Sequence, residues 1–428
     1  MCFFFLYNDS GSDYMEVKIE RLDHQGRGIA KVNNVTTFIP NALVGETVDI
    51  ELTQKKKKFG VGKVNKYINV SPDRVEAICP HFPICGGCDL MHMKYLNQLQ
   101  FKQDKVKNII GRYTSIHSNK IENILNGKEY YYRNKVTFQV KEKIGFFDKK
   151  SYDIVPIEYC YIASKKINEI LSILKTCDLK NIAQIMIRTN EKDIMVVIYS
   201  KQNISEEIID RLQGRCSLLR YDMGYKVING NNSILDTIGD YQFIISPASF
   251  FQVNRNTVKI LYDKVLEYLC PNKNEVVLDL YSGTGTIGIY ISRYVKKVIS
   301  VEMNVYAVKD AVRNKEMNHV DNIEFMCDDV ANVIDKFKHG IDSIIVDPPR
   351  SGLDAKTINY LKEIGASKIV YVSCDPITLA RDLEKLSASY DVNRITPVDM
   401  FPNTYHVECV SLFSLKKGLE KSKNIMTD

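Results

Sequence analysis

Chemically reactive side chains end four apolar segments in the C-terminal half of the chain. Glu302 ends VISVE, Asp329 ends NIEFMCDD, Asp347 ends IDSIIVD, and Cys374 ends KIVYVSC. If these segments are parallel strands of one sheet, their carboxyl ends meet along one edge, where open α/β sheets bind their ligands. Three carboxylates and a thiol on such an edge predict a cofactor site beside a cysteine nucleophile.

A glycine-bearing turn before these segments indicates the class of cofactor. Residues 276–291, VVLDLYSGTGTIGIYI, have the pattern of strand, turn and helix that opens a doubly wound α/β domain. Gly283 and Gly285 let a ligand approach the backbone closely, and Gly288 lets the helix pack tightly on the strand. Glu302 can accept both hydroxyls of a ribose, and the carboxylate that ends the third segment is placed to meet an adenine amine. We therefore expect an adenosine-type cofactor; the alternative is a structural glycine turn.

Cys374 and Glu408 could form a nucleophile–base pair. Glu408 lies in HVECV on a predicted final strand. A thiolate that adds to C6 of uracil turns C5 into an enolate carbon that can attack a methyl sulfonium, and a base must then remove the C5 proton so that the thiolate can leave. Cys409 would point to the opposite face of its strand, so it is not expected to be the nucleophile.

A cysteine-rich segment, CPHFPICGGC, could hold a metal centre. Prolines and glycines separate Cys79, Cys85 and Cys88, so that each thiolate can point inward from a turn. Cys160, in IEYCYI, is the best candidate for a fourth ligand by position. Four thiolates suit zinc or an iron–sulfur cluster, and the absence of the paired C-x2-C spacing of a zinc ribbon favours iron–sulfur. The alternative is a set of unligated thiols.

Two further segments carry neighbouring aromatic residues, and the first of them also carries basic ones. YYYRNKVTFQV, residues 130–140, carries Arg133 and Lys135 on a predicted strand, and SPASFFQVN carries Phe250 and Phe251. Aromatic rings stack on bases while cations neutralise phosphates, which would suit single-stranded RNA. A strand with one exposed basic face explains the first segment equally well, and Phe251 is expected in the core.

Length and composition indicate a multidomain globular protein. The chain has 428 residues, of which 26% are charged, and a net charge of +6, which permits a nucleic-acid partner. It contains no apolar run near the ~20 residues of a membrane span, and the apolar residues 2–7 lack the cationic flank of a signal peptide. Eleven unevenly spaced cysteines favour reduced thiols over a disulfide framework. We expect a cytoplasmic monomer with no membrane partner and no obligate protein partner.

Three domains are predicted. Residues 10–72 contain five short β-like runs with turns between them, which suggests a small OB-like barrel that could bind RNA, with the lysines at 55–58 in a hairpin. Residues 73–240 suggest a central α+β domain that includes the cysteine segment. Residues 241–428 suggest a Rossmann-like α/β domain.

The motifs, taken in order, resemble those of the RNA uracil-5-methyltransferase family, in particular the branch that has an N-terminal TRAM domain and a [4Fe-4S] cluster and acts on 23S ribosomal RNA. The resemblance runs along nearly the whole chain and includes CPHFPICGGC, YRNK, SPASFFQVN, DLYSGTGTIG, DPPRSGL, YVSCDPITLARDL and HVECV. It implies that Cys374 is the nucleophile and Glu408 the base. It also implies a cluster on the four cysteines and S-adenosylmethionine contacts from Gln252, Tyr281, Thr286, Glu302, Asp329 and Asp347. From the residue types alone we further expect Gly283 to lie against the cofactor, and Arg133, Lys135 and Phe250 to contact RNA.

Three positions depart from the family pattern. Ser282 and Asp375 replace the cysteine and asparagine that are common there, and Met91 replaces a glutamine. A negative charge on Asp375 would raise the pKa of the adjacent Cys374. The main alternative is a transfer-RNA uracil-5-methyltransferase, whose members generally lack the N-terminal segments. An amino-methyltransferase is less consistent, because an arginine follows the DPP motif, and a non-catalytic RNA-binding protein would leave Cys374 without a task.

Overall fold

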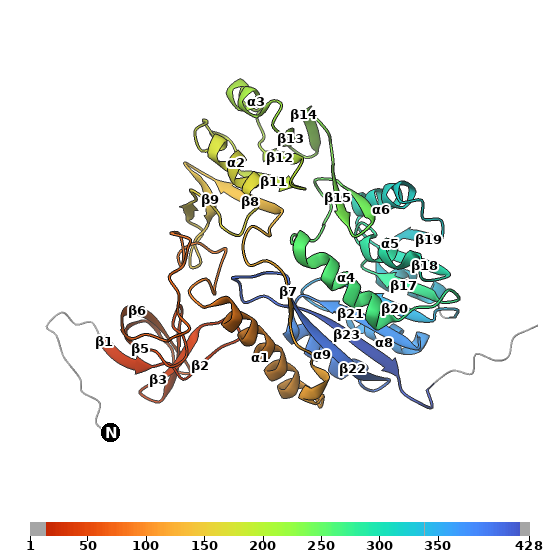
Figure 1. The fold of residues 1–428 in the computed structure, drawn as a ribbon, viewed down its shortest axis with the longest axis horizontal. Helices are drawn as coiled ribbons and strands as arrows, with labels where there is room; N and C mark the ends of the chain where they lie inside the picture. The colour runs from red at the N-terminus through yellow and green to blue at the C-terminus, as the bar shows by residue number, and fades with distance from the viewer. Residues whose placement is uncertain (1–13, 338, 420–428) are drawn as a thin grey trace, which may run out of the picture.

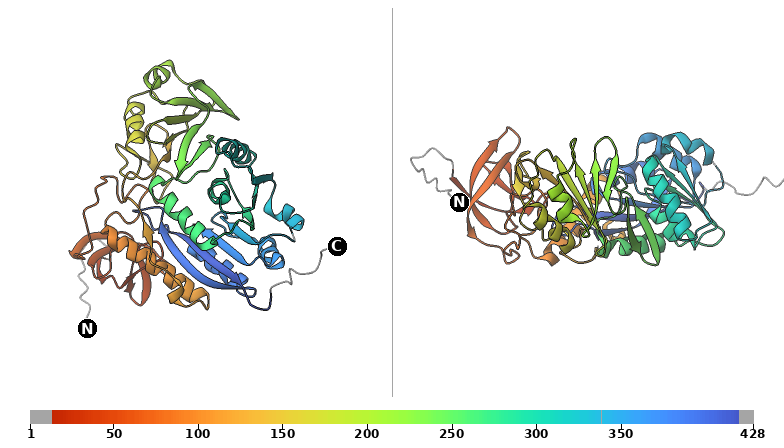
Figure 2. Two further views of the ribbon diagram at one scale, coloured as in Figure 1. Left: turned by 45° about the vertical axis from the view of Figure 1, so that its right-hand side comes forward. Right: turned by 90° about the horizontal axis from the view of Figure 1, so that it is seen from above.

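The structure is a computed structural model that describes residues 14–337 and 339–419, so the apolar residues 2–7 lie outside it. The chain forms three units around successive sheets. Figure 1 shows how they are arranged, and the view from above in Figure 2 places the N-terminal unit and the C-terminal unit at opposite ends, with the central one between them. No helix in the described ranges is long and apolar enough to cross a membrane.

The N-terminal unit is a six-stranded sheet with the order β1-β5-β6-β4-β3-β2. Alternate residues of β4 and β5 face inward, so that Ile39, Val48 and Ile50 form part of a small core. Residues 55–58 are exposed at the turn between β5 and β6, as expected. The strands are β1 (Tyr14–Lys18), β2 (Arg21–Leu22), β3 (Gly28–Val32), β4 (Val35–Ile39), β5 (Thr47–Lys55) and β6 (Gly60–Asn69).

The central unit is a seven-stranded sheet, β10-β9-β8-β11-β12-β13-β14, with two helices packed against it. A separate hairpin follows and packs on helices of the C-terminal unit. The elements are β8 (Lys135–Val140), β9 (Ile144–Phe147), β10 (Ile154–Pro156), α2 (Lys165–Leu174), β11 (Gln184–Thr189), β12 (Ile194–Tyr199), α3 (Glu206–Leu212), β13 (Ser217–Tyr221) and β14 (Tyr225–Asn229), and the hairpin is β15 (Ile234–Ile238) with β16 (Tyr241–Ile245).

The strand expected over residues 130–140 begins only at Lys135. Tyr131 has a φ of 56°, in the left-handed region that a strand does not use. The amides of Tyr131 and Arg133 bond to the carbonyls of Tyr161 and Ile162, just after Cys160, at 3.0 and 2.9 Å. The first part of this segment is therefore tied to the cysteine region.

The C-terminal unit is an eight-stranded sheet with the order β19-β18-β17-β20-β21-β23-β22-β7. The first five strands are parallel and β23 is antiparallel to β21. The elements are α4 (Arg255–Leu269), β17 (Val276–Leu280), α5 (Thr286–Ser292), β18 (Lys297–Glu302), α6 (Val305–Met317), β19 (Ile323–Cys327), α7 (Val330–Val333), η2 (Ile334–Phe337), β20 (Ser343–Val346), α8 (Ala355–Ile364), β21 (Lys368–Ser373), α9 (Pro376–Leu386), β22 (Tyr390–Asp399) and β23 (Glu408–Leu415).

Two elements from the segment assigned to the central domain pack on the C-terminal sheet. These are the helix α1 (Tyr95–Tyr113), which contacts α9 and β22, and the short strand β7 (Leu125–Asn126), which pairs with β22. A 3-10 turn, η1 (Ser118–Lys120), connects them, and Figure 1 shows α1 beside α9 and β22. The buried face of α1 joins the C-terminal core through Val106, Ile109 and Ile110. The core of the C-terminal unit therefore includes residues that lie far earlier in the chain.

Candidate active site

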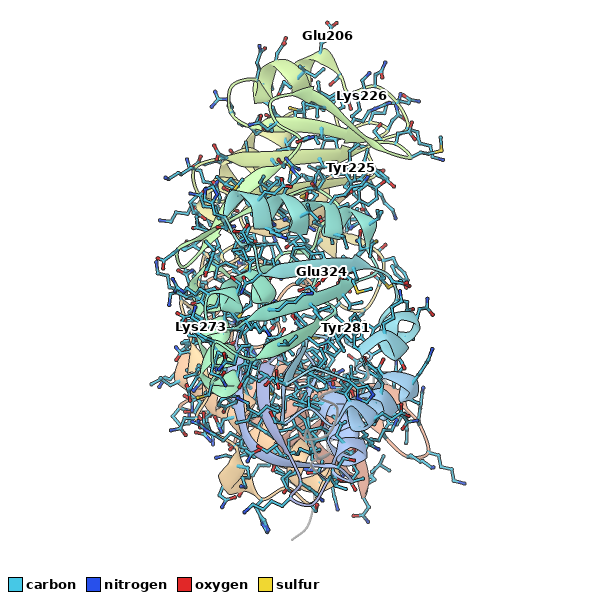
Figure 3. All side chains as sticks on the ribbon, turned by 90° about the vertical axis from the view of Figure 1, so that its right-hand side faces the viewer. Glu206, Tyr225, Lys226, Lys273, Tyr281 and Glu324 are labelled. Carbon is cyan, nitrogen blue, oxygen red and sulfur yellow. The ribbon has the colours of Figure 1, made fainter. Side chains whose placement is uncertain are left out.

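The turn after β17 forms the first part of the site. Gly283 has a φ of 56°, and its amide donates to Oε2 of Glu302 at the end of β18, at 2.9 Å. A Cβ on Gly288 would lie 2.9 Å from Oδ2 of Asp279 and from Oγ of Ser300, so only glycine lets α5 pack this closely on the sheet. Figure 3 shows Tyr281 and Lys273 at opposite ends of β17, with Tyr281 at the carboxyl edge.

Buried polar atoms at this edge have no partner within the part of the chain that the structure describes. They are Oδ1 of Asp279 and Oγ of Ser282. Burial raises the pKa of Asp279 to about 7. A buried polar atom without a hydrogen bond is costly, so such atoms commonly mark a ligand site. Their position beside Gly283 and Glu302 fits a bound adenosine-type cofactor.

The remaining expected cofactor contacts lie in different surroundings. The hydroxyl of Thr286 is 2.6 Å from the hydroxyl of buried Tyr262, so it already has a protein partner. Asp329 is exposed after β19, and Gln252 is buried, its backbone carbonyl accepting from Nδ2 of Asn134 at 3.2 Å. Tyr281 is partly buried, with its hydroxyl 3.4 Å from that of Thr357.

Strand pairing brings Cys374 and Glu408 together. Ser373, the last residue of β21, pairs with Cys409 of antiparallel β23, so the next residue of one strand lies beside the preceding residue of the other. Cys374 is partly buried, and Glu408 is 5% exposed. Cys409 is fully buried in the core, as expected for the opposite face of the strand.

The electrostatics of the pair follow from burial and from neighbouring charges. Burial, followed by the charges of Glu408 and Asp347, raises the pKa of Cys374 to about 12, and Arg350 opposes this. Asp375 also raises it, which agrees with the direction expected from the sequence, although it is the smallest of these causes. Burial raises the pKa of Glu408 to about 8, with Asp347 adding to the rise and Arg350 opposing it.

Asp347 is a third buried acid at this edge, besides Asp279 and Glu408. It follows β20, its amide bonds to the carbonyl of Leu280 at 3.3 Å, and burial raises its pKa to about 7. A site with several poorly solvated acids can hold protons at neutral pH, so it can exchange them with a bound substrate. Glu302, Asp347, Cys374 and Glu408 thus share the edge that the strand ends predicted.

A cavity of about 1940 Å³ is lined by residues of all three units. Arg350 and His406 line it, and their side chains lie 3.4 Å apart. Sequence reasoning missed this pair, although Arg350 directly follows the DPP motif and so could have been found. Because Arg350 lowers the pKa of both Cys374 and Glu408, it connects the cavity wall to the reactive pair.

Three residues expected to contact RNA line the same cavity. They are Arg133, Lys135 and Phe250, and Phe250 is 64% exposed whereas Phe251 is buried in the core, as expected. Burial, followed by Arg188 and Arg133, lowers the pKa of Lys135 to about 8. Lys63 brings further positive charge from the N-terminal unit, whereas Arg27, Arg74 and Lys149, which also line the cavity, are paired with Asp23, Glu46 and Asp89. Cations along a cavity with an exposed aromatic ring suit a nucleic-acid strand.

The four cysteines also gather at this cavity. Cys79, Cys88 and Cys160 pack in one small cluster with Tyr132, and the charges of Cys79 and Cys160 act on Cys85. Burial raises the pKa of Cys88 and Cys160, and raises that of Cys85 to about 11, so thiolates would need a cation to neutralise them. In residues 14–337 and 339–419, no group of three or more His, Cys, Asp or Glu side chains is arranged as a metal-ion site.

Models of two known protein families match this chain, one over its N-terminal unit and one over most of the remainder. A model of the tRNA (uracil-5-)-methyltransferase family matches residues 94–416, and a model of the TRAM domain matches residues 13–65. The chain belongs to the tRNA (uracil-5-)-methyltransferase family. The expected uracil-5-methyltransferase resemblance and the TRAM domain are thereby confirmed, whereas the ribosomal branch and its cluster stay predictions.

Similar proteins extend over most of the chain. An uncharacterized RNA methyltransferase of Clostridium tetani is 38% identical over 432 residues, covering 91% of this chain and 94% of its own. One from Oceanobacillus iheyensis is 37% identical, covering 93% and 95%. The solved tRNA (uracil-54, C5)-methyltransferase of Pyrococcus abyssi, in complex with S-adenosyl-L-homocysteine, is 29% identical with a TM-score of 0.76, covering 93% of this chain and 99% of its own. The chain is therefore an RNA methyltransferase that depends on S-adenosylmethionine.

Proposed function

We propose that this chain methylates C5 of a uridine in 23S ribosomal RNA, with Cys374 as nucleophile and Glu408 as base. The observation that supports these roles best is the pairing of Ser373 with Cys409, which sets the thiol and the carboxyl side by side at the edge that carries the glycine turn. A nucleophile and a base must both reach one small ring, and this pairing satisfies that requirement.

The first step is addition. The sulfur of Cys374 forms a bond to C6 of the uracil, and the electron pair of the C5–C6 double bond moves to give an enolate whose carbon is C5. Arg350 favours this step because its charge lowers the pKa of Cys374. The thiol first gives up its proton to water. The charges of Glu408 and Asp347 oppose this loss because they raise the pKa of Cys374, while the ionised Glu408 stays available for the last step.

S-adenosylmethionine, when bound, supplies an electrophilic methyl group that bonds to C5 as its bond to sulfur breaks. Glu302, Asp347 and the turn at Gly283 are the residues proposed to hold it, with Tyr281 and Gln252 beside them. The unpaired polar atoms of Asp279 and Ser282 support this assignment. Thr286 and Asp329 are the weaker members, because the first already bonds Tyr262 and the second is exposed.

The last step is elimination. Glu408 takes the proton from C5, the C5–C6 double bond forms again, and the bond between C6 and the sulfur of Cys374 breaks. A carboxylate whose pKa is about 8 is a stronger base than an ordinary one, and a general base is most effective when its pKa is near the working pH. The uracil must leave its stack to reach this buried pair.

A transfer RNA is the second candidate substrate, and a specific observation favours it. The Pyrococcus abyssi enzyme, whose substrate is a tRNA, matches 93% of this chain. This coverage weakens the expectation that transfer-RNA enzymes lack the N-terminal segments, so the ribosomal substrate rests on the resemblance of the motifs alone.

The four cysteines are proposed to hold a [4Fe-4S] cluster. Their donor chemistry fits, because soft thiolates are the preferred ligands of iron–sulfur centres and three of them gather in one apolar cluster. Burial raises the pKa of Cys160, and the backbone amides of Ala163 and Ile162 oppose this rise, as donors to a thiolate ligand would. Here the cluster would join the segment of Cys79, Cys85 and Cys88 to Cys160, which is a structural role.

The test compares RNA from a strain that lacks this gene with RNA from the same strain carrying the wild-type gene or Cys374→Ala. Mapping 5-methyluridine in ribosomal and transfer RNA should show one or more ribosomal positions that are lost without the gene, restored by the wild type and not by Cys374→Ala. Loss confined to transfer RNA would replace the substrate, and full restoration by Cys374→Ala would overturn the catalytic role.

A further inference from the structure

The segment that leads into Glu408 is held from outside its own sheet. Residues 400–407, here called the base loop, connect β22 to β23, and side chains of other segments bond its backbone carbonyls. The donors and acceptors are Asn254 to Met400 at 3.0 Å, Lys102 to Phe401 at 2.9 Å, Tyr132 to Pro402 at 3.0 Å and Lys105 to Tyr405 at 2.8 Å. The base loop thus depends on α1, on the segment before β8 and on the segment before α4.

Tyr132 connects the base loop to the cysteines. Its hydroxyl donates to the carbonyl of Pro402, while its ring packs in the cluster that contains Cys79, Cys88 and Cys160. The side chain is 2% exposed, so its hydroxyl has no access to solvent as an alternative partner. A displacement of the cysteine region therefore reaches Pro402 through one rigid ring.

A second connection runs through the backbone. The amides of Asp89 and Leu90, directly after Cys88, donate to the carbonyl of Asn403 at 2.8 and 3.0 Å. Asn403 has a φ of 65°, and its side chain accepts from Gln98 of α1 at 3.1 Å and donates to the carbonyl of Glu129 at 3.2 Å. The base loop is consequently attached to the cysteine segment at two successive residues, Pro402 and Asn403.

Cys374 has no such attachment. It lies between β21 and α9, where Asp375 caps the helix by accepting from the amides of Ile377 and Thr378. Within the residues that the structure describes, the hydrogen bonds of the cysteine segment and of Tyr132 reach the base loop and not this turn. A disturbance of the cysteine region should thus displace the base while leaving the nucleophile in place.

We propose that Tyr132 and Asn403 are positioning residues that use the cysteine region to fix Glu408 for the elimination step. This rests on the proposed roles of Cys374 and Glu408. Proton transfer depends steeply on the distance between donor and acceptor, so a small shift of the base slows elimination more than addition. The cysteine segment, remote in sequence from the chemistry, is thereby given a task in the last step of the reaction.

The experiment compares Tyr132→Phe with Tyr390→Phe. Both changes remove only a hydroxyl, and Tyr390 is a matched control because its buried hydroxyl also donates to a backbone carbonyl at 3.0 Å, that of Leu361, away from the site. Each full-length variant is mixed with unmodified RNA and S-adenosylmethionine, and the fraction of enzyme covalently attached to RNA is measured on denaturing gels beside the turnover rate.

Tyr132→Phe should lower turnover about three- to tenfold, the loss that one buried hydrogen bond accounts for, and raise the attached fraction by a similar factor. A purely structural effect would lower the turnover rate and the attached fraction together, and this result would overturn the inference. So would a ratio of attached fraction to turnover rate that is the same in Tyr132→Phe and Tyr390→Phe. Absence of any adduct between the wild type and 5-fluorouridine RNA would instead refute the proposed function.

Discussion

Replacing Glu408 by glutamine should separate the two halves of the reaction. Glutamine keeps the size of the side chain but cannot take a proton, so elimination loses its base. A general base typically contributes about 10²–10⁴-fold to a rate, so turnover should fall by about that factor. The charge of Glu408 is the largest cause, after burial, of the raised pKa of Cys374. Its removal should lower the pKa of this thiol, so addition should be retained or become faster.

The assay follows methyl transfer from labelled S-adenosylmethionine to RNA in Glu408→Gln and the wild type. Methylated RNA should accumulate on Glu408→Gln as a covalent adduct that survives denaturation, with at most one methyl group transferred per enzyme. Turnover near the wild-type rate would refute the assignment of the base. Failure to retain methylated RNA, by an enzyme that still forms an adduct with 5-fluorouridine RNA, would refute the order of steps.

Three further outcomes follow from the same site. The decay of the methylated adduct should speed up as the pH rises through about 8, because Glu408 accepts a proton only when it is ionised. Arg350→Gln should move this pH dependence to higher pH, since Arg350 lowers the pKa of Glu408. A decay rate that does not change with pH would contradict this. Asp375→Asn should lower the pKa of Cys374 slightly, measured as the pH dependence of thiol alkylation, while asparagine still caps α9, and an unchanged profile would show that Asp375 has no influence. Gly288→Ala should destabilise the fold by about 1–3 kcal/mol through overpacking, and it should weaken S-adenosylmethionine binding measured by calorimetry. Gly111→Ala, whose new Cβ would meet open space on α1, should instead stabilise the fold by about 1 kcal/mol. Equal melting temperatures of the two variants would refute the packing argument.

The edge of the catalytic sheet could be predicted because each of its parts is local in sequence. The strand β17 and its turn have an apolar run followed by glycines, and the residues that end β18, β20 and β21 directly follow apolar strands. Parallel strands necessarily place such residues on one edge. The position of Glu408 beside Cys374 was expected as well, but the antiparallel pairing that produces it is a long-range contact, which only the structure specifies.

The support of the base loop could not be predicted, because its partners are distant in sequence. Lys102 forms a fully buried ion pair with Asp399, the two residues lying 297 positions apart. The apolar spacing of α1 indicated a helix but not which sheet it covers, so the segment was assigned to the central domain. A lysine on a helix is ordinarily solvated, and nothing in the local pattern marks this one as buried.

The most direct test of the account is to locate the covalent bond itself. The wild-type enzyme is incubated with S-adenosylmethionine and RNA containing 5-fluorouridine, which cannot release its C5 substituent as a proton, and the attached peptide is identified by mass spectrometry. We predict a single linkage between C6 of the modified base and the sulfur of Cys374, absent in Cys374→Ala. A linkage to another residue, or an adduct of equal yield in Cys374→Ala, would contradict it.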